Sequence, residues 1–496
     1  MRHFASDRQR QNGFSGAPIV VFAALVVFGL LLGQMISSAS GQLPIILTGA
    51  VAMFFLTVLR PHVALAFLIA AMLLSPEIII ASLPRRDVVI RMEDLLVVVM
   101  GLGWLARSAI HKGIDLIPRT PINGWIGLYA ICFIVATSQG IIGGDVNPLK
   151  AIFYVLKYLE YYIIFFMVVG LAQVKNQQRL YVTMFFLTLM AVNLYAVSQI
   201  GHVERVSAPF EGPTGEPNTL GGYQVLMMCV ALGIFCHARS PRMAWAMAGV
   251  ALFTLWPFLH TLSRASYMAL IPAYLALIFY NRSSRKWTLV FALVLTVFLA
   301  FFILPESVKE RVMYTFNARP QQNIKPVVIF GLQLDPSSSS RWIDWQRAFQ
   351  YWLERPFFGY GITSKSFLDS QYVNNLIETG ACGFIAFAIL IGSLQYHVWR
   401  IYRSIKDDLA RGLALGFMAG NVGILFHALT ANTFVLIRVM EPYWFIAGMI
   451  LAAPRLHAHA PVKQEAPASK AGSLRNIGML LNPGKVRRST GGEDAT

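Results

Sequence analysis

The chain has 496 residues, of which 56% are hydrophobic and only 13% are charged. This excess of apolar residues excludes an ordinary soluble domain and indicates an integral membrane protein. The formal net charge of +17 is expected to favour anionic membrane lipid, so a nucleic-acid partner is not needed to explain it.

Apolar segments of the length that an α-helix needs to cross a membrane, about 17 to 22 residues, recur along the whole chain. Fourteen are predicted, at residues 17–36, 43–59, 62–82, 95–110, 122–142, 151–172, 180–200, 220–237, 243–261, 266–280, 287–304, 376–400, 412–430 and 443–453. The predicted fold class is an all-α integral membrane protein. It is a polytopic bundle of about 12 to 14 transmembrane helices with a large extracytoplasmic loop that contains short helices.

The predicted organisation has five parts. Residues 1–16 are expected to form a cytoplasmic amino terminus, and residues 17–304 to form about eleven transmembrane helices. The large outward loop covers residues 305–375, and the last transmembrane helices cover residues 376–453. Residues 454–496 are expected to form a disordered cytoplasmic tail. The first apolar segment follows basic residues as a signal sequence would, but it is too long for a signal core and is interpreted as an uncleaved anchor. Most of the 41 Lys and Arg residues lie on the side of the termini, which predicts that both termini are cytoplasmic.

The sequence indicates no cofactor. No Cys/His cluster has zinc-ligand spacing, and no phosphate-loop or Rossmann glycine pattern occurs. All four cysteines lie within apolar segments, which argues against a disulfide framework; they are Cys132, Cys229, Cys236 and Cys382. We therefore expect neither a metal centre nor a bound nucleotide.

The outward loop is the strongest indication of function, because a helical bundle does not need a polar excursion of about seventy residues to hold together. The serines at 337–340 are expected to cap a helix that begins near Arg341 and runs to about Glu354, before Pro356. Aromatic residues recur there at helical spacing, namely Trp342, Trp345, Phe349 and Trp352. The helix either lies along the outer membrane surface or packs this stripe onto neighbouring helices.

Arginines near the outer surface are candidates for binding an anion. Arg264 lies in a very short turn between two apolar segments, where a charge is costly unless it is paired or reaches the headgroups. Arg341, Arg347 and Arg355, together with Lys365, belong to the outward loop. Two or more guanidinium groups that converge on a lipid-borne diphosphate would stabilise it through bidentate bonds. The alternatives are a headgroup anchor and solvated surface charges.

Two carboxylates near the start of the next helix are candidates for a general base. Asp369 precedes the helix, and Glu378 lies within it on the same face as Asn374. A carboxylate near the bilayer surface can have a raised pKa and accept a proton. Each carboxylate has the alternative role of capping a helix or pairing with an arginine.

Polar residues elsewhere complete the candidate site. The outward loop at 201–218 contains Arg205 and Asn218, which suit hydrogen bonding to sugar hydroxyls. Lys157 and His427 are ionisable residues inside apolar segments and are functional candidates for that reason. Loops are generally polar and buried ions are often structural, so both interpretations stay open.

Five stretches together resemble the O-antigen ligase and polymerase superfamily. They are RMEDL at 91–95, PNTLGG at 217–222, TLSRA at 261–265, Arg341 followed by PFFGYG at 356–361, and DSQYVNNLIETG at 369–380. The resemblance implies a membrane glycosyltransferase of the C type that works at the outer face of the bacterial inner membrane without a nucleotide sugar. It further implies an undecaprenyl-diphosphate-linked oligosaccharide as substrate and membrane lipid as a partner, with a chain-length regulator and export machinery as further partners.

Ligases of this superfamily usually have histidine at the position of Asp369, whereas polymerases often have aspartate, so the resemblance favours the polymerase branch. It implies catalytic roles for Asp369, Glu378 and Arg264. The implied substrate-binding residues are Arg341, Arg347, Arg205, Asn218, Tyr372, Lys157 and His427. The alternatives are a ligase that transfers glycan to lipid A core, a transporter, for example of bicarbonate, and an accessory subunit of an export complex.

Overall fold

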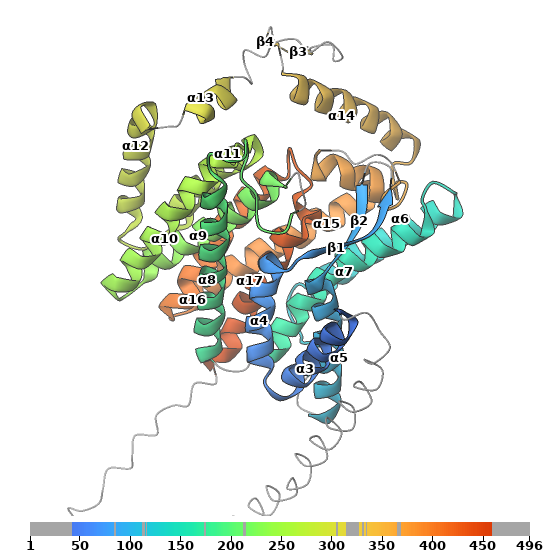
Figure 1. The fold of residues 1–496 in the computed structure, drawn as a ribbon, viewed down its shortest axis with the longest axis horizontal. Helices are drawn as coiled ribbons and strands as arrows, with labels where there is room; N and C mark the ends of the chain where they lie inside the picture. The colour runs from blue at the N-terminus through green and yellow to red at the C-terminus, as the bar shows by residue number, and fades with distance from the viewer. Residues whose placement is uncertain are drawn as a thin grey trace, which may run out of the picture. The chain divides into compact units, whose positions relative to one another are not determined.

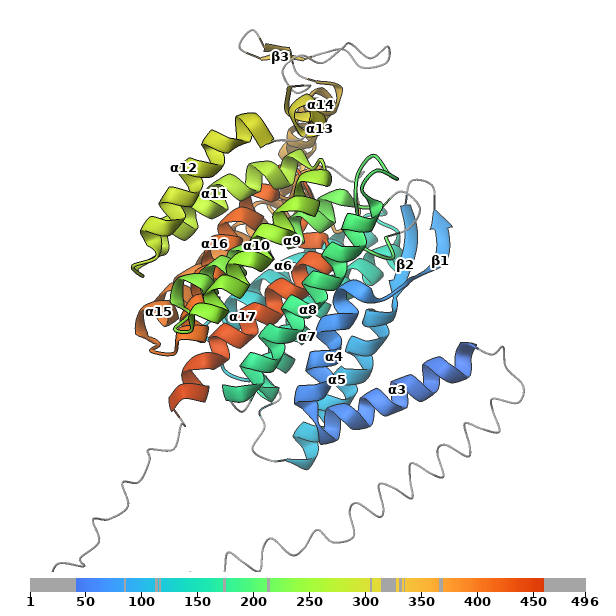
Figure 2. The same ribbon diagram turned by 60° about the vertical axis from the view of Figure 1, so that its left-hand side comes forward.

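The computed structural model describes residues 42–83, 86–111, 115, 117–172, 175–211, 215–303, 306–313, 327–329, 332–333, 335–364 and 369–458. The predicted anchor at 17–36, Lys365 and the tail beyond residue 458 lie outside these residues. Figure 1 shows the helices packed side by side, and Figure 2 shows the same bundle from a second direction. The predicted fold class, an all-α polytopic membrane protein, is confirmed.

The described helices and strands are, in chain order, α3 Gln42–Leu59, α4 Pro61–Leu74, β1 Glu77–Leu83, β2 Arg86–Arg91, α5 Met92–Ile110, α6 Asn123–Ile142, α7 Pro148–Leu171, α8 Lys175–Gln199, α9 Pro217–His237, α10 Pro241–His260, α11 Arg264–Tyr280, α12 Lys286–Ile303, α13 Glu306–Met313, β3 Val328–Ile329, β4 Leu332–Gln333, α14 Pro336–Glu354, α15 Gln371–Ser404, α16 Asp408–His427, η1 Thr433–Val435 and α17 Ile437–Ala458. The strands form two small antiparallel hairpins, β1–β2 and β3–β4.

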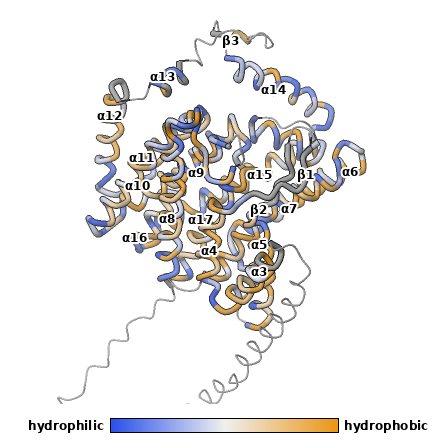
Figure 3. Tube along the Cα trace, in the orientation of Figure 1, coloured by the Kyte–Doolittle hydropathy of each residue, from blue (hydrophilic) through white to orange (hydrophobic). Residues whose placement is uncertain are grey.

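Seven helices in the described part of the chain are long and apolar enough to cross a membrane: α6, α7, α8, α9, α10, α15 and α16. Shorter apolar helices accompany them, among them α4 and α11. In Figure 3 the helices of the bundle contain much more hydrophobic colour than α14, which is largely hydrophilic. The protein is therefore a multi-pass membrane protein in which α13 and α14 are polar helices.

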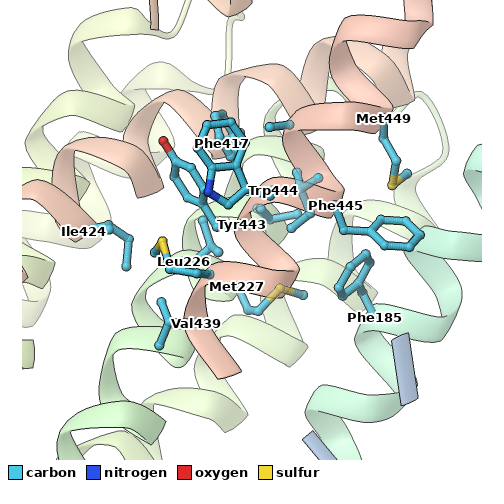
Figure 4. Close-up of a cluster of buried hydrophobic side chains, with 14 of the residues drawn as sticks. Phe185, Leu226, Met227, Phe417, Ile424, Val439, Tyr443, Trp444, Phe445 and Met449 are labelled. Atoms are coloured by element: carbon cyan, nitrogen blue, oxygen red, sulfur yellow. The ribbon is translucent and has the colours of Figure 1, made fainter. Parts of the chain in front are cut away.

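Helices α9 and α16 form the centre of the bundle. Small residues allow them to approach closely, since a Cβ added at Gly233 would lie only 2.4 Å from the backbone of Gly412 and Gly416. Glycines spaced in this way are the usual means of close helix contact in membranes, where association depends on packing. Figure 4 shows Leu226 and Phe417 from these helices within a cluster of buried apolar side chains that α17 completes.

Helix α15 is broken near its N-terminal end. Gly380 has φ 64° and ψ −169°, a conformation that is essentially restricted to glycine. The turn at 356–361 fills the break: Tyr360 N–H donates to Ile377 O and Gly361 N–H to Glu378 O, both at 2.9 Å, and Ala381 N–H donates to Pro356 O at 2.8 Å. The interrupted backbone therefore regains its hydrogen bonds from the turn, as a buried break requires.

The predicted start of the helix in the outward loop was wrong, although its end at Glu354 was right. Helix α14 begins at Pro336, with Asp335 at the N-cap position. Proline fits the first helical position because its missing N–H would have no partner there. The serines that were expected to cap the helix thus lie in its first turn. Trp342 and Phe349 of the aromatic stripe are exposed, whereas Ala348 on the same helix packs against Tyr360 and Ile377.

Candidate functional site

Arg264 forms an ion pair with a carboxylate from the outward loop. It is the first residue of α11, whose N-cap Ser263 accepts a hydrogen bond from Ser266 N–H. The Arg264 guanidinium donates to Asp335 at 2.9 Å, and their side chains are 17% and 1% exposed. Burial acts to raise the pKa of Asp335, but hydrogen bonds from Arg264 and Ser338 outweigh it and hold this pKa below its ordinary value. The pair therefore stays ionised at neutral pH.

A second pair lies farther along α14. The Arg341 guanidinium donates twice to one oxygen of Asp369, at 3.2 and 3.3 Å. The Asp369 side chain is 62% exposed, unlike the buried Asp335. Helix α14 is thus tied to the start of α11 by its N-cap residue and to the segment before α15 by Arg341. Both predicted arginines lie at this junction, each held by a carboxylate.

Next to Arg264, a polar network links the loop after α8 to the start of α9. Arg205 donates to Thr261 O at 3.0 Å and to the side-chain oxygen of Asn218 at 3.3 Å. The Ser263 hydroxyl donates to the same oxygen at 2.8 Å. The structure therefore brings Arg205 and Asn218 together beside the N-terminus of α11, as a shared site requires.

The network continues inward to a fully buried histidine. The Ser266 hydroxyl donates to that of Ser263 at 2.8 Å and lies 3.2 Å from Nε2 of His427. Nδ1 of His427 lies 2.7 Å from the Thr433 hydroxyl. A Cβ added at Gly222 would lie 3.4 Å from the histidine ring, so glycine leaves room for it. His427 thus joins the same network as Arg205 and Asn218.

The N-terminus of α15 is fastened to the end of α16. The backbone N–H of Gln371 donates to Ala428 O at 3.0 Å, and the Tyr372 hydroxyl donates to Leu425 O at 2.7 Å. Asp369 precedes this anchored segment by two residues. The anchoring restricts the backbone at the point where Asp369 meets solvent.

Glu378 lies in a different environment from Asp369. Its side chain is buried and accepts a hydrogen bond from Thr363 N–H at 2.9 Å, while its backbone oxygen accepts from Gly361. Both groups hold the turn that fills the break in α15. Of the two predicted bases, Asp369 is accessible to a substrate and Glu378 is committed to the turn.

Two predicted residues lie apart from the Arg264 network. Lys157 pairs with Asp94 and lies 3.6 Å from Glu160 inside the bundle. Arg347 is exposed on α14, where Asp344 lies 3.9 Å away. Neither of these pairs includes a residue of the Arg264 network, so the predicted binding roles of Lys157 and Arg347 remain predictions.

Arg355, the remaining arginine proposed from the outward loop, has its own partners. It donates to Asp145 at 2.7 Å and lies over the ring of Tyr360, 4.6 Å from its centroid. These contacts hold the end of α14 against the loop after α6. Arg355 therefore stabilises the turn at 356–361 and is not part of the pair between Arg341 and Asp369.

Sequence reasoning missed several residues of the site. In the sequence, Asp335 is an ordinary carboxylate of a loop, and Ser266 and Thr433 carry no charge. Only the fold places Asp335 beside Arg264, and Ser266 and Thr433 beside His427. Asp335 alone had a local signal, since an aspartate before proline and serines is a good N-cap.

A buried ionic group outside the network was missed as well. Arg438 and Glu211 are each 1% exposed and lie 3.9 Å apart, and Arg438 also donates to the backbone oxygens of Ser75 and Phe210. Burial raises the pKa of Glu211 to about 8, although the charge of Arg438 acts in the opposite direction. Arg438 escaped notice because the last apolar segment was predicted to begin only at residue 443, whereas α17 begins at Ile437.

Comparison with known families bears directly on this junction. Residues 248–388 match the family model described as O-antigen ligase. This part of the chain is similar to the O-antigen ligase family. This confirms the resemblance to the O-antigen ligase and polymerase superfamily and, with it, an enzyme of the glycosyltransferase type. No curated protein matches the chain.

The matched region runs from within α10 to within α15. It contains both ion pairs, Arg264 with Asp335 and Arg341 with Asp369. Three polar residues of the site lie outside the matched region, namely Arg205, Asn218 and His427. The fold brings them into the hydrogen-bond network next to Arg264. The matched region therefore contains the charged part of the site, and the flanking helices supply its polar surroundings.

Proposed function

We propose that the protein polymerises a cell-surface polysaccharide, an O-antigen or an exopolysaccharide. It transfers glycan from a polyprenyl-diphosphate carrier to an acceptor sugar at the outer face of the bacterial inner membrane. The observation that carries this proposal is the pair of arginines, Arg264 and Arg341, held at one junction of the matched region. Guanidinium groups bind diphosphate oxygens in bidentate fashion more favourably than any other side chain.

The spacing of the two pairs suits one diphosphate. Asp335 and Arg341 are six residues apart on α14, about 9 Å at 1.5 Å per residue. Asp369 is exposed, so the donor diphosphate can draw Arg341 away from it, whereas Arg264 binds the diphosphate while it keeps its bond to the buried Asp335. The negative charge of the diphosphate is then neutralised as the bond to the anomeric carbon breaks, which stabilises polyprenyl diphosphate as the leaving group.

The exchange of partners also gives Asp369 its role. When Arg341 turns to the diphosphate, the exposed Asp369 carboxylate loses its guanidinium partner and becomes a better proton acceptor. It takes the proton of the acceptor hydroxyl as the oxygen attacks the anomeric carbon. Glu378 acts indirectly by holding the turn at 356–361. Arg205, Asn218 and His427 supply hydrogen-bonding groups for the sugars.

Ligation to lipid A core is the second candidate, and the description of the matched family favours it. Both reactions use the same donor and the same leaving group, and they differ only in the acceptor. The aspartate at position 369 favours polymerisation. If the protein is a polymerase, we expect two further kinds of partner, a protein that sets chain length and a machinery that exports the product.

Deletion of the gene followed by sizing of the accumulated glycan separates the two candidates. A polymerase leaves a single repeat unit on its lipid carrier, which is the expected result. A ligase leaves full-length polymer on the carrier. Unchanged surface glycan in the deletion strain would contradict both.

A further inference from the structure

Basic residues gather at the opposite end of the bundle from the candidate site. The helices α9, α11, α15 and α16 each carry a residue of that site near one end, and the other end of each lies in this basic region. Helices α9, α11 and α16 have 21, 17 and 20 residues, which corresponds to roughly 25–32 Å at 1.5 Å per residue. The two regions are therefore separated by about the thickness of the hydrocarbon core, roughly 30 Å.

The helix ends and connections at 237–242, 281–286 and 400–411 contain nine basic residues and only two acidic ones. The nine form what we call the basic cluster, namely Arg239, Arg242, Arg282, Arg285, Lys286, Arg400, Arg403, Lys406 and Arg411. Both carboxylates are already engaged, since Asp408 pairs with Arg239 and Asp407 accepts a hydrogen bond from Ala410 N–H at 3.1 Å. These three segments therefore carry a large excess of positive charge.

Hydrogen bonds bring the segments together. The hydroxyl of the buried Tyr402 lies 3.2 Å from Nε2 of His237 and accepts from Arg282 N–H at 3.1 Å. Arg285 donates to Ala238 O at 2.8 Å, at the C-terminus of α9, where the helix dipole favours a cation. The end of α9, the turn between α11 and α12 and the end of α15 therefore form one surface.

Arg411 at the start of α16 is placed to bind an anion at this surface. Its guanidinium lies over the ring of Tyr402, 5.9 Å from the centroid. Its Nε is buried and has no hydrogen-bond partner among the described residues, which is costly for an N–H group. A phosphate oxygen is an acceptor that suits a guanidinium group. A phosphate that binds here therefore satisfies Arg411 and neutralises part of the basic cluster.

Aromatic residues place the basic cluster at the level of the lipid headgroups. Trp245, Trp287 and Tyr396 are exposed, and each lies one to four residues from a member of the cluster. Arg403 lies over the ring of Trp399, 4.8 Å from the centroid. Indole and phenol side chains concentrate at the interface between membrane and water. This position favours a lipid phosphate over a soluble anion or an acidic protein as the partner.

We propose that the basic cluster binds the phosphate of an acidic phospholipid in the leaflet opposite the candidate site, with Arg411 as the central contact. Basic pockets between membrane helices are suited to acidic headgroups, and the surface potential of acidic lipid attracts them. The lipid joins the ends of the same helices whose other ends carry the candidate site. It therefore stabilises the arrangement of helices that positions that site, and its binding does not depend on the proposed transfer of glycan.

The test titrates the full chain in detergent with phosphatidylglycerol and counts bound lipid by native mass spectrometry, with phosphatidylcholine as the neutral comparison. In the wild type we expect phosphatidylglycerol to bind about tenfold more tightly. Arg411→Gln should weaken this binding about fivefold to tenfold, whereas Arg411→Lys retains the charge and should stay within about threefold of the wild type.

The matched control is Arg179→Gln, which removes an exposed arginine from the start of α8, outside the basic cluster. Its charge contributes only screened attraction, so the affinity should change less than about twofold. Thermal unfolding without added lipid shows whether each variant is folded. If Arg411→Gln unfolds earlier than the wild type, Arg403→Gln takes its place with the same expectation, because Arg403 is an exposed member of the cluster.

Equal binding of phosphatidylglycerol and phosphatidylcholine would overturn the proposal and leave the cluster to a soluble acidic partner. Unchanged affinity in the glutamine variant of the cluster would overturn it as well. An equal loss in Arg179→Gln would show that overall charge, and not this site, attracts the lipid. Displacement of phosphatidylglycerol by millimolar inorganic phosphate would contradict a lipid site and identify a site for a free anion.

Discussion

Replacement of Asp335 by asparagine tests whether a buried carboxylate holds Arg264 in place. Asparagine is about as good an N-cap as aspartate, so the change removes the charge and leaves the start of α14 intact. Breaking a buried ion pair costs about 3–5 kcal/mol. Because Arg264 is 17% exposed and reaches some water, we expect a smaller cost than that range, about 2–3 kcal/mol.

The assay combines thermal unfolding in detergent with initial rates of glycan transfer. At roughly 2–4 °C for each kcal/mol in a domain of this size, the unfolding midpoint of Asp335→Asn should fall by several degrees. The matched control is Asp344→Asn on the same helix, whose pair with Arg347 is exposed and should be worth about 0–1 kcal/mol. We expect kcat/KM to fall about tenfold to a hundredfold in Asp335→Asn and to be nearly unchanged in the control.

The effect of pH adds a second check. The pKa of Asp335 in the folded protein lies below its ordinary value. Stability from this pair is therefore fully present above the ordinary pKa of the carboxyl and is lost only as the pH falls through the lower, folded value. The difference between wild type and Asp335→Asn should stay constant from pH 5 to pH 8. Equal stability of the two proteins, or a difference that rises steeply within this window, would refute the reasoning.

Three further substitutions test the site and the turn. Asp369→Asn should lower kcat by about 10²- to 10⁴-fold with little change in KM, measured as initial rates; an unchanged kcat would exclude Asp369 as the base. Glu378→Gln retains an oxygen for Thr363 N–H and should keep kcat within about threefold, whereas a loss as large as that of Asp369→Asn would make Glu378 the base. Gly380→Ala should lower the unfolding midpoint by the equivalent of at least about 1–3 kcal/mol, because the added Cβ would lie 2.3 Å from the backbone oxygen of Phe357. Gly249→Ala, with open space at the same position, should not lower it, and equal midpoints would show that the break in α15 is not strained.

The sequence predicted the elements that depend on local pattern. Apolar runs of membrane length predicted helices such as α9 and α16 to within about four residues at each end, because a helix in lipid must satisfy its own backbone. Arg264, Arg341 and Asp369 were found because charges beside apolar segments are rare and costly. The pairing of Asp369 with an arginine was predicted only as an alternative, and Asp335 was not predicted as a partner of Arg264, since pairing depends on how α14 crosses the bundle.

Features that depend on distant contacts were not predictable. The break at Gly380 needs the turn at 356–361 to supply hydrogen bonds, and no local pattern links the two. His427 was selected as an ionisable residue in an apolar segment, but its contact with Ser266 joins residues 161 positions apart.

The central claim is that guanidinium groups at the outer surface bind the donor diphosphate. The most direct test compares wild type and Arg264→Ala in liposomes supplied with a lipid-linked repeat unit, with the product separated by size. We expect a ladder of polymer from the wild type and a rate reduced by about 10²- to 10³-fold in Arg264→Ala, with both proteins inserted to the same extent. A full-length ladder from Arg264→Ala at the wild-type rate would contradict the account.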